Sequence, residues 1–238
     1  MNRWLILGLV LGMGAAAQAD LRGEWKAGQK AYAREDFAAA LKQFEAARFL
    51  AVQAGLDTAK LDANRGSALF RSGQLEEAET AFARAVQTAD LAVQADAWFN
   101  LGCARLARGK LVLKEKQAKA ADDLFAAAME AFRQSLKLRS DDLDAKINFE
   151  LTLVERQKLR GYVLGVRDQI ANSDALIQQR QYAQALALLS QPTEDIDMAV
   201  DLEPELKQAL EQRQERTGQL VQLIEQLQQP AAAPEGSP

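Results

Sequence analysis

The stretch WFNLGCARLARG, residues 98–109, lies near the middle of a 238-residue chain and shares its residue spacing with two earlier stretches. In residues 26–48 and again in residues 63–86, a glycine is followed twelve positions later by an alanine, and four positions after that by a phenylalanine. Equivalent positions in the two stretches are thirty-eight residues apart, and they are Gly28, Ala40, Phe44 and Gly66, Ala78, Phe82. Self-similarity at a period of this size indicates a repeated pair of helices.

The third copy begins with residues 98–109 and ends in AMEAFRQSLKL, residues 128–138. Its glycine, Gly102, precedes the matching Ala128 by twenty-six residues, fourteen more than in the other copies. Fourteen residues is close to four helical turns, so two extra turns in each helix keep both faces in phase. The sequence therefore predicts a hairpin that extends beyond its neighbours by about 10 Å, at a rise of ~1.5 Å per residue.

The composition predicts an all-α fold. Apolar residues make up 48% of the chain and aromatic residues only 6%, so alanine and leucine supply most of the apolar content. Glutamine, glutamate, lysine and arginine are also abundant, and all of these are strong helix formers. No proline occurs between Asp20 and Gln191, whereas three of the five prolines fall in residues 230–238. This last segment is predicted to be a disordered tail.

These glycine, alanine and phenylalanine positions resemble the tetratricopeptide repeat (TPR) over about residues 22–155. The resemblance implies a right-handed α-α superhelix of helix hairpins with a C-terminal capping helical region. The predicted array, residues 20–156, holds three repeats, the third with lengthened helices, and a following helix over residues 144–153. Glycines are expected where the two helices of a repeat approach closely. Three phenylalanines are expected to fill the gap to the next repeat: Phe44, Phe82 and Phe132.

Residues 157–229 are predicted to form a degenerate repeat and capping helices. A first helix is expected around residues 163–180 and a second one from Tyr182. Pro192 is expected to end that second helix, because proline lacks the backbone donor. A final amphipathic helix is predicted over residues 203–229, either docked onto the array or paired with a partner helix.

The first nineteen residues have the plan of a secretory signal peptide. Arg3 is followed by an apolar run from Trp4 and by Ala-Gln-Ala at residues 17–19, so cleavage is predicted after Ala19. The alternative is a retained membrane anchor, but the apolar run is somewhat shorter than the ~20 residues that a span needs. We therefore expect an exported protein, located in a bacterial periplasm.

The residue inventory argues against an enzyme. The chain has no histidine and a single cysteine, Cys103, which removes histidine-based catalysis and most zinc sites. No GxxxxGK[ST] stretch is present to bind phosphate. A net charge of −4 lacks the basic character of nucleic-acid-binding proteins. We expect no cofactor and no metal, and we interpret Cys103 as a small buried residue rather than a reactive thiol.

The TPR resemblance implies a concave groove lined by the first helices of the repeats. The sixth position of those helices points into the groove in that family, and here it holds Lys26, Asn64, Asn100 and Asn148. An asparagine amide offers a donor and an acceptor to an extended peptide. The same amides can instead satisfy neighbouring helices, and both interpretations stay open. Other expected groove residues are Trp25, Tyr32, Phe70, Arg71 and Phe99.

The predicted tip of the long hairpin is basic, because it carries Lys110, Lys114, Lys116 and Lys119. A basic tip on an acidic protein is either a solvated surface or an element that docks a partner. Deletion of the extra turns would separate these two interpretations.

A narrower resemblance concerns the segment DDLDAKINFEL, residues 141–151. It is similar to small exported TPR proteins of Bat-type (aerotolerance) gene clusters, which accompany von Willebrand factor A-type membrane proteins. The resemblance implies a non-enzymatic periplasmic adaptor that binds protein or peptide partners in an envelope or stress-related complex. The alternative function is a structural or self-associating scaffold with no peptide ligand.

Overall fold

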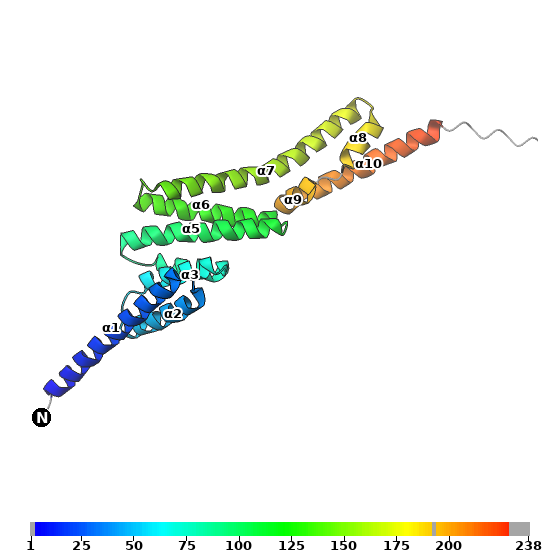
Figure 1. The fold of residues 1–238 in the computed structure, drawn as a ribbon. Helices are drawn as coiled ribbons and strands as arrows, with labels where there is room; N and C mark the ends of the chain where they lie inside the picture. The colour runs from blue at the N-terminus through cyan, green and yellow to red at the C-terminus, as the bar shows by residue number, and fades with distance from the viewer. Residues whose placement is uncertain (1–2, 192–193, 229–238) are drawn as a thin grey trace, which may run out of the picture. The chain divides into compact units, whose positions relative to one another are not determined.

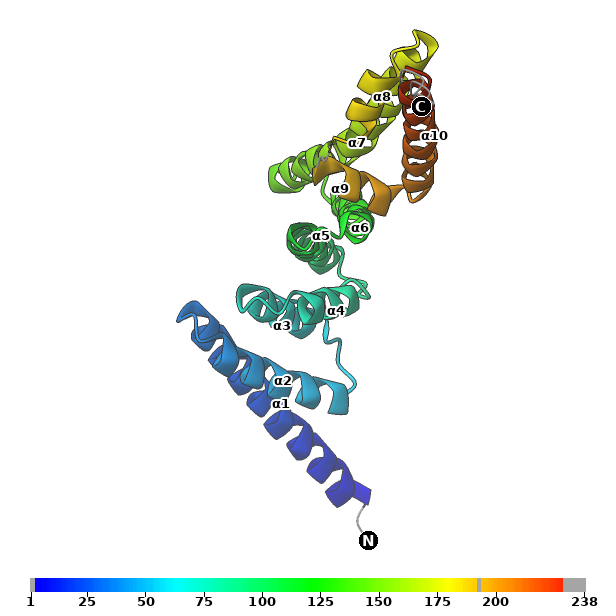
Figure 2. The same ribbon diagram turned by 90° about the vertical axis from the view of Figure 1, so that its right-hand side faces the viewer.

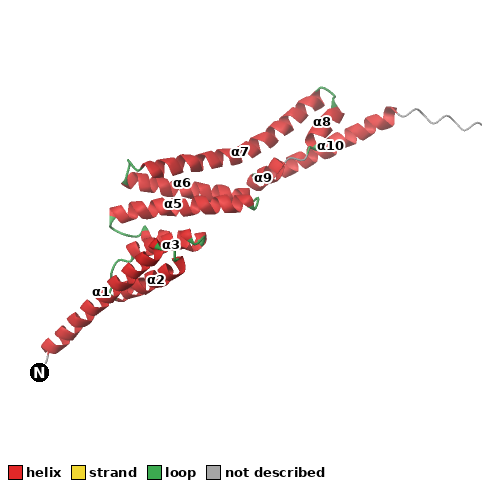
Figure 3. Ribbon diagram, viewed as in Figure 1, coloured by secondary structure: helices red, strands yellow, loops and turns green. Residues whose placement is uncertain are grey.

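A computed structural model describes residues 3–191 and 194–228, and every regular element within these residues is an α-helix (Figure 1, Figure 3). The all-α prediction is therefore confirmed. The helices are α1 (Arg3–Ala33), α2 (Phe37–Gln53), α3 (Ala59–Arg71), α4 (Leu75–Ala85), α5 (Leu91–Lys114), α6 (Ala118–Leu138), α7 (Leu143–Gln178), α8 (Tyr182–Leu189), α9 (Glu194–Leu202) and α10 (Glu205–Gln228). The predicted tail, residues 230–238, and Pro192 lie outside the described residues.

The chain divides into two compact units, and the division falls inside α7 between Glu155 and Arg156. The first unit takes Met1–Leu113 and Ala120–Glu155. The second takes Lys114–Lys119 and Arg156–Pro238.

In the first unit, α1 pairs with α2 and α3 pairs with α4, and α2 also contacts α3 (Figure 2). The turns between paired helices have specific local causes. Asp36 caps α2 by accepting a hydrogen bond from the Ala39 backbone N–H at 3.0 Å. Between α3 and α4 the chain turns at Gly73, whose φ of +80° is in the left-handed region that glycine adopts most easily. Short turns of this kind produce antiparallel helix pairs.

A glycine on the first helix of each hairpin lies against a phenylalanine ring on the second helix. The pairs are Gly28 with Phe44, Gly66 with Phe82 and Gly102 with Phe132, and a Cβ built on these glycines would lie 2.6, 2.7 and 2.5 Å from the ring. A side chain at the glycine would therefore collide with the ring. The prediction for the phenylalanines was incomplete, because each ring packs within its own hairpin and not only toward the next one.

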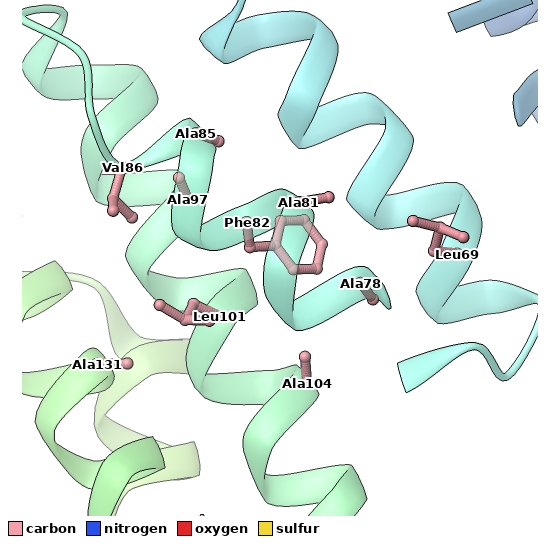
Figure 4. Close-up of a cluster of buried hydrophobic side chains, with 10 residues drawn as sticks. All are labelled: Leu69, Ala78, Ala81, Phe82, Ala85, Val86, Ala97, Leu101, Ala104 and Ala131. Atoms are coloured by element: carbon pink, nitrogen blue, oxygen red, sulfur yellow. The ribbon is translucent and has the colours of Figure 1, made fainter. Parts of the chain in front are cut away.

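Figure 4 shows how neighbouring hairpins share a core. The ring of Phe82 on α4 belongs to a buried cluster with Leu101 and Ala104 on α5. Most members of this cluster are alanines, which lets helices approach closely: Ala78, Ala81, Ala85, Ala97, Ala104 and Ala131. Because the side chains are small, a single phenylalanine supplies much of the buried apolar volume in each layer.

The third hairpin is longer than the second mainly at the end where its two helices are joined by a turn. Helix α5 continues for twelve residues past Gly102, whereas α3 continues for five past Gly66. Helix α6 begins ten residues before Ala128, whereas α4 begins three before Ala78. At the turn end, each helix of the third hairpin is thus longer by seven residues, or about two turns. At the other end, α5 begins four residues earlier relative to its glycine and α6 ends three residues later relative to its alanine.

Helix α7 differs from the sequence prediction, which placed separate helices over residues 144–153 and 163–180. The structure has one continuous helix of 36 residues. No proline or cap interrupts the intervening residues, and Gly161 alone does not stop a helix that is held by packing on both sides of it.

The second unit packs α8, α9 and α10 against the C-terminal part of α7. Its core contains Val163 and Val166 from α7, Leu189 from α8, Ala199 from α9 and Leu206 from α10. The final helix is thus docked within this unit. Its bounds, Glu205–Gln228, are close to the range predicted.

Helix α1 is continuous from Arg3 to Ala33 and passes through the predicted cleavage site after Ala19. Among the described residues, no helix combines the length and apolar character that crossing a membrane requires. Signal-peptide cleavage, export and the superhelical arrangement of the hairpins stay predictions.

Candidate peptide-binding groove

The structure forms a cavity of about 230 Å³ between α1, α2 and α3. Two predicted groove residues, Tyr32 and Asn64, line it together. Its other lining residues, Gln29, Phe44 and Ser67, were not predicted as groove residues. Gln29 and Ser67 lie one turn from predicted positions, so helical spacing around Lys26 and Asn64 was the signal that could have found them. We call this cavity the groove cavity, and its five lining residues are Gln29, Tyr32, Phe44, Asn64 and Ser67.

The polar groups of the groove cavity make only some of the hydrogen bonds that they could make within the chain. The Ser67 hydroxyl donates to the Ala63 carbonyl oxygen at 2.9 Å, which leaves its oxygen able to accept. Asn64 is half-buried, and its amide makes no hydrogen bond within the described part of the chain. A half-buried amide with a free donor and acceptor is suited to bind a peptide backbone.

A cation–aromatic cluster lies beside the groove cavity and joins the first three helices. The ring of Tyr32 meets Phe37 edge-on, with centroids 5.6 Å apart. Arg71 places its guanidinium 5.4 Å from the centroid of the Phe37 ring and pairs with Glu35 at 2.9 Å. Arg71, a predicted groove residue, is therefore held by contacts within the chain, and it helps to position Tyr32 through Phe37.

The three groove asparagines do not share one environment. Asn148 on α7 donates from Nδ2 to the Cys103 sulfur on α5 at 3.5 Å, so its amide joins two helices. Asn100 is half-buried like Asn64, and the described residues offer its amide no hydrogen bond. The interpretation that an asparagine satisfies a neighbouring helix thus fits Asn148, whereas Asn64 and Asn100 keep their hydrogen-bonding capacity.

The thiol of Cys103 is held in its neutral form. Burial raises its pKa to about 12, and the hydrogen bond from Asn148 only partly opposes that rise. Since the thiolate is the nucleophile, this cysteine is poorly reactive at neutral pH.

Three aromatic residues predicted for the groove also make packing contacts within the chain. Trp25 packs against the apolar cluster around Ala40 and Phe44, and Phe70 packs against the cluster around Phe82. Phe99 lies 6.0 Å from the Phe132 ring, centroid to centroid. Trp25, Phe70 and Phe99 are half-buried, so each packs against a neighbour and still exposes part of its ring, and their role in the groove stays a prediction. Lys26 is exposed on α1.

A buried ion pair that was not predicted from the sequence joins the first two hairpins. Asp62 on α3 is 1% exposed. Its carboxylate accepts from Arg48 Nε on α2 and from the Thr58 hydroxyl, each at 2.7 Å. Nothing in the local sequence signals this pair, because its members come from different hairpins.

A second ion-pair network joins the second and third hairpins. Glu79 on α4 accepts from Arg105 Nε at 2.8 Å and from Arg108 Nη1 at 2.9 Å. One carboxylate thus holds two guanidinium groups on successive turns of α5, which fixes the relative register of α4 and α5.

The predicted docking tip has its own contacts. Lys110 lies 3.9 Å from the Glu155 carboxylate. In the second unit, the Lys119 backbone N–H donates to the Asp201 carboxylate on α9 at 2.7 Å, which caps the first turn of α6. Lys114 and Lys116 are exposed. The tip is therefore partly engaged within the chain itself.

No protein-family model matches this chain, and no curated protein is significantly similar to it. The described residues contain no group of three histidine, cysteine, aspartate or glutamate side chains placed to hold a metal ion. What the site can do chemically is to present amides, a hydroxyl and aromatic surface to a ligand.

Proposed function

We propose that this chain is a non-enzymatic adaptor that binds an extended segment of a partner protein at the groove cavity. The observation that carries the proposal is the unpaired, half-buried amide of Asn64 beside Tyr32 and Gln29. An amide can donate to one backbone carbonyl and accept from one backbone N–H of an extended segment. Asn100 would extend the same recognition along the next hairpin.

The aromatic surroundings favour a peptide over a small charged ligand. Tyr32 and Phe44 give the groove cavity an apolar floor, and its lining residues carry no charge. A partner side chain would be buried there while its backbone bonds to Asn64. Arg71, which contacts the Phe37 ring beside Tyr32, is already paired with Glu35.

The proposed location is a bacterial periplasm, and the proposed family is TPR. The spacing of glycine, alanine and phenylalanine supports the TPR assignment, and the first nineteen residues support export. The segment 141–151 supports a role beside von Willebrand factor A-type membrane proteins in a Bat-type envelope or stress-related complex.

An affinity experiment tests the binding proposal. The full chain and its Asn64→Ala/Asn100→Ala variant are used as bait in an envelope extract, and recovered proteins are identified by mass spectrometry. We expect a partner whose recovery falls about tenfold with the variant, since each of the two amides would contribute roughly 0.5–1.5 kcal/mol to binding. Circular dichroism checks that both baits are folded.

Asn172→Ala provides the matched control, because Asn172 is an exposed amide on α7 far along the chain from the groove cavity. If all three baits recover the same amount of the partner, binding at the groove cavity is contradicted and the hairpin tip becomes the candidate binding site. Recovery of no partner by any bait would contradict the adaptor and favour the scaffold.

A further inference from the structure

A cavity of about 530 Å³ lies in the second unit, where α7, α8 and α10 meet (Figure 1). It is more than twice the volume of the groove cavity. Helix α10 lines it with side chains on one helical face, spaced by three, one and three residues: Arg213, Arg216, Thr217 and Leu220. A cavity of this size can enclose a small organic molecule.

The hydroxyl of Thr217 is a buried polar group without a hydrogen-bond partner in the described part of the chain. The residue is 1% exposed, and its Oγ1 atom bonds to no described atom. Most buried polar atoms in folded proteins are hydrogen-bonded, and an unpaired one has lost its bonds to water without replacement. Threonine populates two side-chain rotamers in a helix, so this hydroxyl can turn toward a ligand. Because Thr217 lines the cavity, a polar ligand atom there would supply the missing partner.

Arg213 and Asp174 form an ion pair in the wall of the cavity. The Nε and Nη2 atoms of Arg213 each donate to the Asp174 carboxylate at 3.0 Å, and Nη1 donates to the Ala209 carbonyl oxygen at 3.1 Å. The pair joins α10 to α7, and each charge balances the other. Arg213 therefore fixes the wall and has no charge left for a ligand.

Arg216, one turn further along α10, lines the same cavity and makes no ion pair within the described residues. Among the lining residues that the structure describes, two carry a positive charge and Asp174 carries a negative one, so one net positive charge remains. This balance favours a ligand with a single negative charge. A second negative charge would lie near the Asp174 carboxylate with no cation to balance it.

Apolar and hydrogen-bonding side chains complete the lining. Ile177 on α7, Leu220 on α10 and Tyr182 on α8 are half-buried and line the cavity with apolar surface. The Tyr182 hydroxyl makes no hydrogen bond within the described residues and can donate to an anion. The cavity therefore combines one unpaired cation, two hydroxyls and an apolar wall.

We propose that this cavity binds a small organic monocarboxylate with an apolar body. A guanidinium binds a carboxylate through two parallel hydrogen bonds, which assigns the charged end of the ligand to Arg216. Thr217 and Tyr182 supply hydroxyl donors to the same carboxylate. Ile177 and Leu220 bury the apolar body. The carboxylate belongs to a free acid or to the C-terminal residue of a peptide, and its site does not depend on the groove cavity.

Fluorine NMR of the full chain, produced with 3-fluorotyrosine, tests the site directly. The chain has three tyrosines, and Tyr182→Phe identifies the Tyr182 signal. We expect 4-phenylbutyrate to shift that signal saturably, with a dissociation constant of about 1 mM, as for other ligands of this size. 4-Phenylbutyramide has the same shape without the charge, and we expect it to bind at least about tenfold more weakly.

Substitution of two lining residues separates a binding role from a structural one. Arg216→Gln is expected to raise the dissociation constant of 4-phenylbutyrate about tenfold, to that of the amide. Arg160→Gln is the matched control, because Arg160 is exposed on α7 and does not line the cavity. Thr217→Val removes an unpaired hydroxyl at nearly constant volume, so we expect weaker binding of 4-phenylbutyrate with no loss of thermal stability by circular dichroism.

Two peptides distinguish the sources of the carboxylate. Acetyl-Ala-Ala-Phe carries a C-terminal carboxylate, and the same peptide with a C-terminal amide is its control. Tighter binding of the peptide acid than of 4-phenylbutyrate assigns the site to a peptide C-terminus, and weaker binding assigns it to a free acid.

Four results would each overturn the proposal. The first is the absence of a saturable shift of the Tyr182 signal at about 20 mM 4-phenylbutyrate, well above the expected dissociation constant. The second is equal affinity for the acid and the amide, and the third is unchanged affinity in Arg216→Gln. The fourth is tighter binding of inorganic phosphate than of 4-phenylbutyrate, which would contradict a site for a monocarboxylate.

Discussion

A Cβ built on Gly109 would lie 2.5 Å from Cε1 of Phe125, and this contact repeats the one between Gly102 and Phe132. The two glycines are seven residues apart on α5, and the two phenylalanines are seven residues apart on α6. The extra length of the third hairpin therefore contains a second copy of the same helix–helix contact. Because seven residues is close to two turns, the added residues face the same way as the original ones.

We expect Gly109→Ala to destabilise the chain by about 1–3 kcal/mol, because the added methyl forces the Phe125 ring out of its position. The measurement is urea unfolding followed by circular dichroism. Gly218→Ala on α10 is the matched control, since a Cβ there meets nothing within 4 Å. This control should stabilise by ~0.5–1 kcal/mol through helix propensity. Equal effects of the two substitutions would refute the contact.

Loss of Arg48 should leave the buried Asp62 carboxylate with only the Thr58 hydroxyl as partner. We expect Arg48→Met to lower the free energy of unfolding by about 3 kcal/mol, since an unpaired buried charge is poorly solvated. Arg84→Met serves as the control, because Arg84 and Arg48 line one surface pocket and Arg84 makes no ion pair in the described structure. The control should change stability by less than ~0.5 kcal/mol. Similar losses in both variants would mean that the ion pair is not the cause.

The carboxyl of Asp57 links stability to pH. The Thr88 hydroxyl donates to it at 2.6 Å, and this bond, with one from the Ala59 N–H, lowers the pKa of Asp57 below its ordinary value of 3.8. A lowered folded-state pKa adds stability above the unfolded pKa, and that stability is lost as pH falls through the folded pKa.

Thr88→Ala should therefore raise the pKa of Asp57 toward its ordinary value, as measured by NMR titration of the carboxyl carbon. The acid-sensitive part of the stability should shrink with it. Thr80→Ala is the control, because the Thr80 hydroxyl donates to a backbone carbonyl and not to a carboxylate. An unchanged Asp57 titration in Thr88→Ala would contradict the assignment.

Cys103 should react slowly with thiol reagents in the folded chain. With a pKa raised by burial from 9.0 to about 12, its thiolate fraction at pH 8 falls roughly 10³-fold. We expect the reaction with a disulfide reagent to be slower by about that factor in native buffer than in guanidinium chloride. Comparable rates in the two solvents would show that Cys103 is accessible and not held neutral.

The hairpins were predictable because glycine and phenylalanine recur at fixed spacing. Helical periodicity places these residues on facing sides of paired helices, where they contact each other. The continuity of α7 was missed because the repeat pattern suggested a break where no residue stops a helix. Spacing also located Asn64 and Tyr32 on facing helices. It could not reveal that Asn148 bonds to Cys103 or that Asp62 pairs with Arg48, because these partners are brought together only by the packing of separate hairpins.

The glycine–phenylalanine contact occurs twice in the α5–α6 hairpin, seven residues apart on each helix, so the hairpin can lengthen by seven residues per helix. Insertion of one heptad in each helix adds one ring-over-glycine layer and leaves every other contact in phase, whereas insertion of five residues would rotate the far end by about 140°. Relatives of this chain should therefore differ at this hairpin by multiples of fourteen residues. Removal of residues 103–109 and 119–125 would make the turn end of this hairpin as long as that of its neighbour. The reach of the hairpin therefore changes in steps of about two turns per helix.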